Sequence, residues 1–232
     1  MKTLFLFIAV IYSSTCFSQK IFFRVYNDSV SLVQDANHIV QNFTKDINAI
    51  KPIFSTNPEA VLNTQPSLIF YSSEQNRINL PIWEQVMSEQ KEFFFELGGG
   101  QENGKEIFGL FFNGFFLPHE LGHALQEAAN SQENNLYQNE YFANIVAILY
   151  WRKENRNEEL QHCYTYAKKM MAQLPNPVPE GEDPIQYFNN NYDQLGANPY
   201  KYGYYQFAQI VEIFEDKTLP NFEEYIRNYL SK

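Results

Sequence analysis

Two histidines four residues apart, His119 and His123, and the glutamate between them, Glu120, are the residues whose types and spacing point most directly to chemistry. On a helix, side chains four residues apart lie on one face, so both imidazoles can bind a single metal ion. Imidazole is a common ligand of zinc, and Zn²⁺ is therefore the predicted cofactor. Glu120 directly follows the first ligand, which directs its carboxylate beside the metal. There it can accept a proton from water and later donate it to a leaving amine.

A catalytic zinc site needs a third protein ligand, and Glu140 is the predicted one. The helix that carries His123 is expected to continue to about Asn130, and residues 131–135 are expected to turn the chain. An antiparallel helix would then return Glu140 to the level of His123, at a rise of about 1.5 Å per residue. Asn144 lies one turn after Glu140 and can accept the free ring N–H of a zinc-bound histidine, which would fix its tautomer.

Segment 119–123, His-Glu-Leu-Gly-His, followed by segment 139–144, Asn-Glu-x-x-Ala-Asn, resembles the gluzincin metallopeptidases of the thermolysin-like clan. The resemblance spans residues 119–144 and implies a zincin-like fold and hydrolysis of peptide bonds. That pattern usually has Asp where Asn144 stands, and Asn can orient a histidine but adds no charge. The link between the two segments is also short for that family. The resemblance implies zinc ligation by His119, His123 and Glu140, with Glu120 as general base.

A hydrolase of this kind also needs a donor to the developing oxyanion. Related enzymes often use Tyr or His from the C-terminal lobe. A tyrosine cluster lies at residues 200–205, and Tyr202 and Tyr205 are the predicted donors. The alternative is that these tyrosines are packing or surface aromatics.

A second expected contact with substrate is an edge strand over the zinc helix, which would pair with the substrate backbone. Residues 77–80 alternate in polarity and stop at Pro81, as an edge strand does. A purely structural role for this strand is the alternative.

The surrounding sequence predicts an α+β fold, with a small N-terminal sheet and helices packed on a mainly helical C-terminal lobe. The N-terminal α/β lobe is expected at about residues 19–118 and the helical lobe at about 119–232. The spacing of apolar residues and the positions of proline and glycine predict where the helices and strands lie. Strands are expected at residues 20–25, 68–71 and 77–80, and helices at 30–47, 82–96, 107–117, 135–156, 158–174, 199–216 and 221–230, with an exposed proline-rich loop at 174–184 that could form a lid.

Composition narrows the function classes. The chain has 232 residues, 44% of them hydrophobic, which is enough to build a core. A formal net charge of −10 disfavours nucleic acid as a partner, because phosphate backbones repel an acidic chain. Lys2, a short apolar run and small residues up to Ser18 predict a signal peptide at residues 1–18. The run is too short to span a bilayer, so we expect an exported chain, periplasmic or secreted, without stable membrane insertion after cleavage.

These observations together predict a zinc-dependent hydrolase of peptide bonds, with a peptide or protein as substrate and Glu120 as general base. Two alternatives remain. The chain could be a catalytically inactive zinc-binding protein with a binding or scaffold role, or it could hydrolyse a non-peptide amide.

Overall fold

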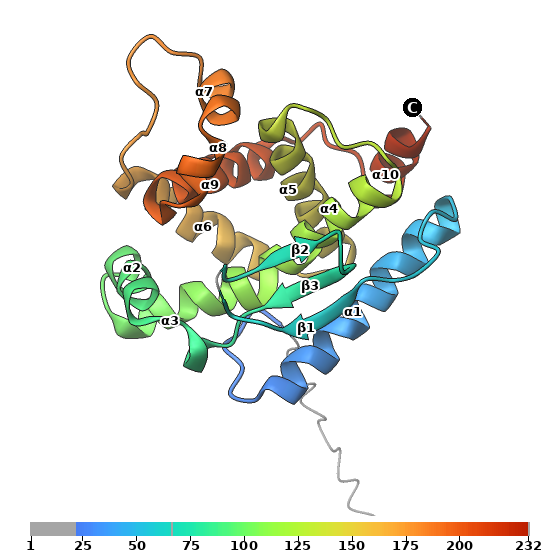
Figure 1. The fold of residues 1–232 in the computed structure, drawn as a ribbon, viewed down its shortest axis with the longest axis horizontal. Coiled ribbons are helices and arrows are strands. Elements are labelled where there is room, and N and C mark those ends of the chain that lie inside the picture. The colour runs from blue at the N-terminus through green and yellow to red at the C-terminus, as the bar shows by residue number, and fades with distance from the viewer. Residues whose placement is uncertain (1–21, 66, 232) are drawn as a thin grey trace, which may run out of the picture.

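The computed structural model describes residues 22–65 and 67–231 and confirms the α+β fold, with a small N-terminal sheet and a majority of helix. The predicted signal peptide lies outside the described residues. Helix α1, Ser29–Ile50, runs along the sheet (Figure 1). It is capped by Asp28, whose carboxylate accepts the N–H of Ser31, and it buries one apolar stripe that includes Phe43 and Ile47.

The sheet has three strands, β1 (Glu59–Leu62), β2 (Phe70–Ser72) and β3 (Arg77–Leu80), in the order β1-β3-β2. β1 is parallel to β3, and β2 is antiparallel to it. The sequence interpretation of residues 77–80 as an edge strand is therefore wrong, because β3 is paired on both sides. The edge strand that contacts helix α4 (Phe116–Ala128) is β2.

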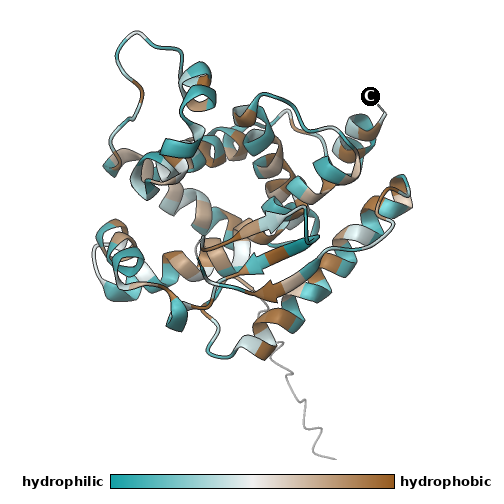
Figure 2. Cartoon of the chain, viewed as in Figure 1, coloured by the Kyte–Doolittle hydropathy of each residue, from teal (hydrophilic) through white to brown (hydrophobic). Residues whose placement is uncertain are grey.

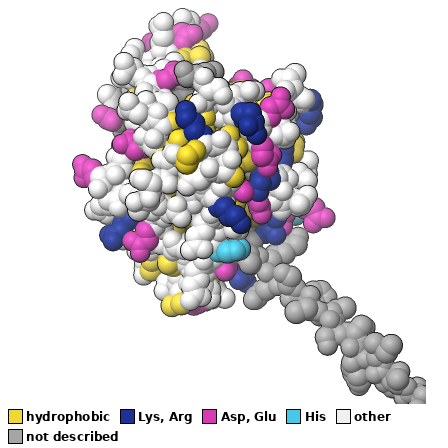
Figure 3. All heavy atoms as spheres, turned by 90° about the vertical axis from the view of Figure 1, so that its right-hand side faces the viewer, with side chains coloured by type: hydrophobic (Ala, Val, Ile, Leu, Met, Phe, Trp, Pro, Cys, Tyr) yellow, Lys and Arg dark blue, Asp and Glu magenta, His cyan; other side chains and the backbone are white. Residues whose placement is uncertain are grey.

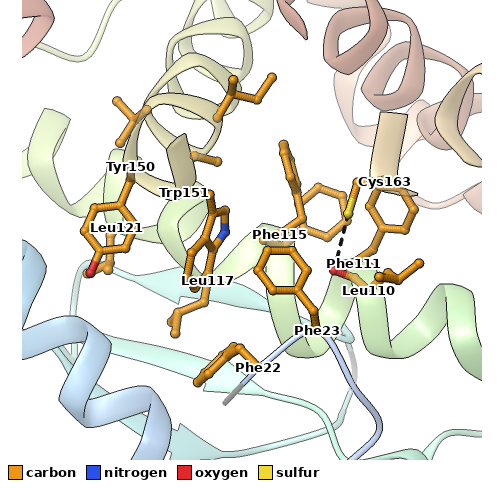
Figure 4. Packing of buried hydrophobic residues seen from close by; sticks show 14 of the residues in the cluster. Phe22, Phe23, Leu110, Phe111, Phe115, Leu117, Leu121, Tyr150, Trp151 and Cys163 are labelled. Carbon is orange, nitrogen blue, oxygen red and sulfur yellow. Dashed lines mark hydrogen bonds between the residues drawn. The ribbon is translucent and has the colours of Figure 1, made fainter. Parts of the chain in front are cut away.

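The described part of the expected first strand is not a strand either. Phe22 and Phe23 are buried in left-handed backbone conformations, with φ of 66° and 59°. The N–H of Phe23 donates to the carbonyl of Asn113 at 2.8 Å, so it has a helix rather than a strand as its partner. Figure 4 shows the two phenylalanines in the core beside Trp151. This segment crosses the helical stretch that leads into α4.

That stretch is one continuous path with an irregularity. Helix α3, Gln101–Leu110, passes through a π-helical segment, Phe111–Phe115, directly into α4. A Cβ at Gly114 would lie 2.6 Å from the ring of Phe23, so only glycine allows the N-terminal segment to pass there. Pro118 lies in the first turn of α4, where its missing N–H costs little.

The remaining predicted helices are present in the expected order, together with two short helices within residues 184–196 that were not predicted. A short 3-10 turn at Trp83–Gln85 and helix α2, Ser88–Gly98, replace the single helix expected at 82–96, because Val86 and Met87 are extended. α2 ends at Gly99 with φ of 72°. The C-terminal part contains α5 (Leu136–Lys153), α6 (Asn157–Gln173), α7 (Pro184–Asn190), α8 (Tyr192–Gly196), α9 (Pro199–Glu215) and α10 (Phe222–Leu230).

One hydrophobic cluster contains residues of both predicted lobes, from Phe22 to Leu230. The core therefore does not separate the lobes, and the boundary between them stays a prediction. Apolar residues concentrate on the strands and central helices, whereas the loop between α6 and α7 is largely hydrophilic (Figure 2). Basic and acidic side chains are interspersed on the face that carries α1 and α10 (Figure 3). Across the described ranges, no helix combines the length and apolarity that crossing a membrane requires.

Candidate metal centre

Helices α4 and α5 bring His119, His123 and Glu140 together, and these three residues form a buried group that can hold a metal ion. The two Nε2 atoms are 3.2 Å apart, and Oε2 of Glu140 lies 3.3 Å from Nε2 of His119 and 3.7 Å from Nε2 of His123. The side chains of His119 and Glu140 are each 5% exposed, whereas that of His123 is 21% exposed. The group therefore faces outward only at His123.

The spacing of these atoms fits a metal of the size of zinc. At zinc–ligand distances of about 2.0–2.1 Å, neighbouring ligand atoms of a tetrahedral site lie roughly 3.3–3.4 Å apart. The three observed separations, 3.2, 3.3 and 3.7 Å, lie close to that value. Two imidazoles and one carboxylate are also the donor set of many catalytic zinc sites. The residues present thus fit zinc in geometry and in chemistry.

Close packing of α4 on α5 makes this approach possible. A Cβ on Gly122 would lie 2.9 Å from Cα of Ala143, closer than side chains approach a backbone. Gly122 lies one residue before His123, and Ala143 lies three residues after Glu140. The contact between glycine and alanine therefore brings the two helices together at the level of the candidate ligands.

Each histidine has an amide partner on its other ring nitrogen. Nδ1 of His119 lies 2.9 Å from Oδ1 of Asn144, and Nδ1 of His123 lies 3.1 Å from Oε1 of Gln126. When these ring nitrogens carry the hydrogen, both Nε2 lone pairs face Oε2 of Glu140. Three lone pairs then converge on one point, which is favourable only with a metal ion or a proton among them.

The pKa values of His123 and Glu140 also favour positive charge within the group. Burial alone would lower the pKa of His123, but the charge of Glu140 and its hydrogen bond raise it to about 9. Burial would also raise the pKa of Glu140, but the two histidines outweigh it and hold that pKa well below its usual range. The site is therefore built to hold positive charge beside an ionised Glu140.

Glu120 is not a member of this ligand group. Its Oε2 accepts the backbone N–H of Tyr71, in strand β2, at 2.8 Å. The residue is 7% exposed, and burial raises the pKa of its carboxyl, against the opposing charges of His119 and His123. Strand β2 thus fixes the carboxylate next to the candidate ligands without making it a member of the group.

A cavity of about 290 Å³ opens over the three residues. Glu120, Tyr202 and a further tyrosine, Tyr192, lie in its wall, and the edge strand β2 forms one side. Tyr205 is not among the lining residues, and its hydroxyl donates to the backbone carbonyl of Pro184. The full lining is Ile69, Phe70, Tyr71, Ser73, His119, Glu120, His123, Gln132, Glu140, Tyr192 and Tyr202.

Tyr192 was not anticipated from the sequence. Its hydroxyl donates to Oε1 of Glu140 at 2.9 Å, and it accepts a hydrogen bond from Tyr202. The residue belongs to the short helix α8, 52 positions from Glu140 along the chain. A tyrosine in a polar stretch carries no local signal of such a contact. The same holds for Gln206, in α9, which donates to Oε2 of Glu140 at 2.8 Å.

Comparison with known proteins adds no family to this geometry. No protein-family model matches the chain, and neither the curated proteins nor the solved structures contain a significant match to it.

Proposed function

We propose that this protein is a zinc-dependent hydrolase of peptide bonds. The observation that carries the proposal is the convergence of His119, His123 and Glu140 at tetrahedral ligand spacing, with the Glu120 carboxylate beside them in the same cavity. The resemblance of segments 119–123 and 139–144 to gluzincins agrees with this assignment.

The chemistry divides between the metal and the chain. When bound, zinc polarises a substrate carbonyl and lowers the pKa of a water molecule. Glu120 takes the proton from that water and passes it to the leaving amine, for which a buried carboxyl with a raised pKa is suited. The N–H of Tyr71 holds the Glu120 carboxylate in place during both transfers.

A tyrosine hydroxyl is the proposed donor to the oxyanion. Tyr202 and Tyr192 both lie in the cavity wall. Tyr202 is the proposed donor because its hydrogen bonds the neutral hydroxyl of Tyr192 and can turn to an oxyanion, a stronger acceptor, whereas the hydroxyl of Tyr192 donates to the Glu140 carboxylate. The position of the Tyr205 hydroxyl, on the carbonyl of Pro184, favours a packing role for that residue.

The proposed substrate is a peptide or protein segment held along β2. This strand is paired on one side only, with β3, and Phe70 and Tyr71 line the cavity. An extended peptide could add to that edge by hydrogen bonds to main-chain groups other than the N–H of Tyr71, which Glu120 occupies. Export to the periplasm or the medium, after removal of residues 1–18, stays part of the proposal, as does the absence of nucleic acid among its partners.

The test compares the purified chain with its Glu120→Gln variant for bound metal and for cleavage of a mixed peptide library. We expect about one zinc per chain in both, and a loss of cleavage of about 10²- to 10⁴-fold in the variant. Glu127→Gln, an exposed change on the same helix, is the matched control and should cleave like the wild type. A chain that takes up no zinc overturns the proposal.

The same experiment separates the alternatives. Bound zinc without cleavage of any peptide would favour a binding or scaffold role. Cleavage of small non-peptide amides, abolished by Glu120→Gln while peptides stay intact, would favour an amidase.

A further inference from the structure

We infer that an array of buried amide side chains fixes the ring tautomer of His119, and that two glutamines of helix α9, Gln206 and Gln209, are positioning residues for the metal centre. The inference depends on the proposed function in one respect, since it takes His119 and Glu140 as metal ligands. Neither glutamine lies in the motif segments 119–123 and 139–144.

Each amide of the array could face a given neighbour with its nitrogen or with its oxygen. A backbone carbonyl at one end of the array decides between the two orientations. Nε2 of Gln209 donates to the carbonyl of Tyr137 at 3.3 Å, and a carbonyl can only accept. The amide group of Gln209 must therefore present its nitrogen to Tyr137. Its oxygen then faces Asn144, whose Nδ2 donates to it at 2.9 Å.

Asn144 passes this direction on to His119. Its amide nitrogen donates one hydrogen to Gln209 and the other to Oε1 of Gln206, at 3.0 Å. Its oxygen is left to face Nδ1 of His119, at 2.9 Å, and can only accept from it. The hydrogen of the neutral imidazole is thus held on Nδ1, and the Nε2 lone pair is free for a metal.

Gln206 carries the same direction to the third ligand. Its oxygen accepts from Asn144, so its nitrogen donates to Oε2 of Glu140, at 2.8 Å. This is the carboxylate oxygen that faces both histidines. One array therefore orients two candidate ligands on different helices, and α9 supplies the link between them.

The reversed arrangement is unfavourable at both ends. Turning every amide over would place the oxygen of Gln209 against the carbonyl of Tyr137, and the oxygen of Gln206 against the carboxylate of Glu140. Each would be a buried contact between two acceptors, since Gln206 is 4% and Gln209 1% exposed. The amide groups fix the tautomer of His119 without adding any charge to the site.

A separate set of contacts holds His123 by the same principle. The backbone N–H of Glu133 donates to Oδ1 of Asn139, and Nδ2 of Asn139 donates to the carbonyl of Glu133. This orients Gln126, whose Nε2 donates to Asn139 at 3.1 Å and whose oxygen faces Nδ1 of His123. Both tautomers are thus fixed from backbone groups.

The test reads the tautomer directly, by ¹⁵N NMR of the imidazole rings in the metal-free chain, under conditions in which the rings are neutral. We expect His119 as the Nδ1–H form in the wild type. Gln206→Met/Gln209→Met removes both acceptors of the Asn144 amide nitrogen and should give a mixture of both tautomers. Gln209→Met alone leaves the Gln206 oxygen, which the bond to Glu140 holds toward Asn144, and should retain the Nδ1–H form. His38 and His162 provide internal references in the same spectra.

Zinc affinity, measured by chelator competition, is the second measurement. Gln206→Met should weaken zinc binding by about 10- to 100-fold, whereas Gln161→Met, the same change at an exposed position of α6, should not alter it. An Nε2–H form of His119 in the wild type, or a pure Nδ1–H form in the folded double variant Gln206→Met/Gln209→Met, overturns the inference. The wild-type spectrum decides even when a variant does not fold. Because neither measurement involves turnover, a chain that cleaves no peptide leaves this inference intact.

Discussion

The hydroxyls of Tyr202 and Tyr192 form a short chain of hydrogen bonds that ends on Oε1 of Glu140. The two residues therefore act on different atoms. Tyr192 holds a candidate metal ligand, whereas Tyr202 donates only to the neutral hydroxyl of Tyr192 and is the proposed donor to a substrate oxyanion. We expect Tyr202→Phe to lower kcat by about 10²- to 10³-fold and to leave zinc affinity unchanged. Steady-state kinetics and chelator competition on the same preparations measure both quantities.

Tyr192→Phe is the matched comparison, because it also removes a single hydroxyl from the cavity wall. It should weaken zinc binding by about 10- to 100-fold through loss of the bond to Glu140. Equal effects of the two variants on zinc affinity would contradict this division of roles.

The residues of the candidate metal centre could be predicted because their relation is local. His119 and His123 need only one helical turn, and Glu140 needs one helical hairpin. Tyr192 and Gln206 contact Glu140 from 52 and 66 positions away, and such contacts depend on how α8 and α9 pack. No spacing rule relates residues at those distances along the chain.

At the scale of the helix pair, Gly122 determines how closely α4 approaches α5. An added methyl group would overlap Cα of Ala143, at 2.9 Å, and Cβ of Ala143, at 3.2 Å. We expect Gly122→Ala to lower the free energy of unfolding by about 1–3 kcal/mol, as overpacking does, and to weaken zinc binding by moving Glu140 away from His123. Denaturant unfolding and metal competition test the two effects.

Gly196→Ala is the control for that change. A Cβ at Gly196, at the end of α8, meets no atom within 4 Å, so the substitution should be neutral or slightly stabilising. If Gly122→Ala were as stable as Gly196→Ala and bound zinc equally well, the spacing of the helices would not limit the site.

The sheet shows where local patterns stop being informative. The alternation of residues 77–80 identified a strand, and Pro81 suggested an edge. Strand β1 lies 18 positions earlier and pairs with β3 in parallel, and its four residues carry no clear alternation. The π-helical turn at Phe111–Phe115 was also not predicted; in the structure Phe23, about 90 positions earlier, packs against it at Asn113 and Gly114. Pairing partners and helix irregularities are set by tertiary contacts rather than by periodicity.

Over the whole molecule, many of the tyrosine hydroxyls are buried or bonded to carboxylates, and this makes the fold sensitive to alkali. Burial and the hydrogen bond to Asp35 raise the pKa of Tyr26 from 10.0 to about 12. Burial and Glu106 do the same for Tyr166. Burial also raises the pKa values of Tyr150 and Tyr225, with nearby charges adding to the shift. In each case the folded state holds the phenolic proton more tightly than the unfolded state does.

Stability from this source is complete below the unfolded pKa of 10.0 and is lost as the pH rises toward about 12. In that window the unfolded chain binds fewer protons than the folded chain, so the free energy of unfolding must fall with pH. Denaturant unfolding at a series of pH values, with tyrosinate absorbance followed in parallel, measures both. Tyr26→Phe removes one such group and should flatten the slope. A free energy of unfolding that stays constant across the window would mean that the folded and unfolded chains hold these protons equally.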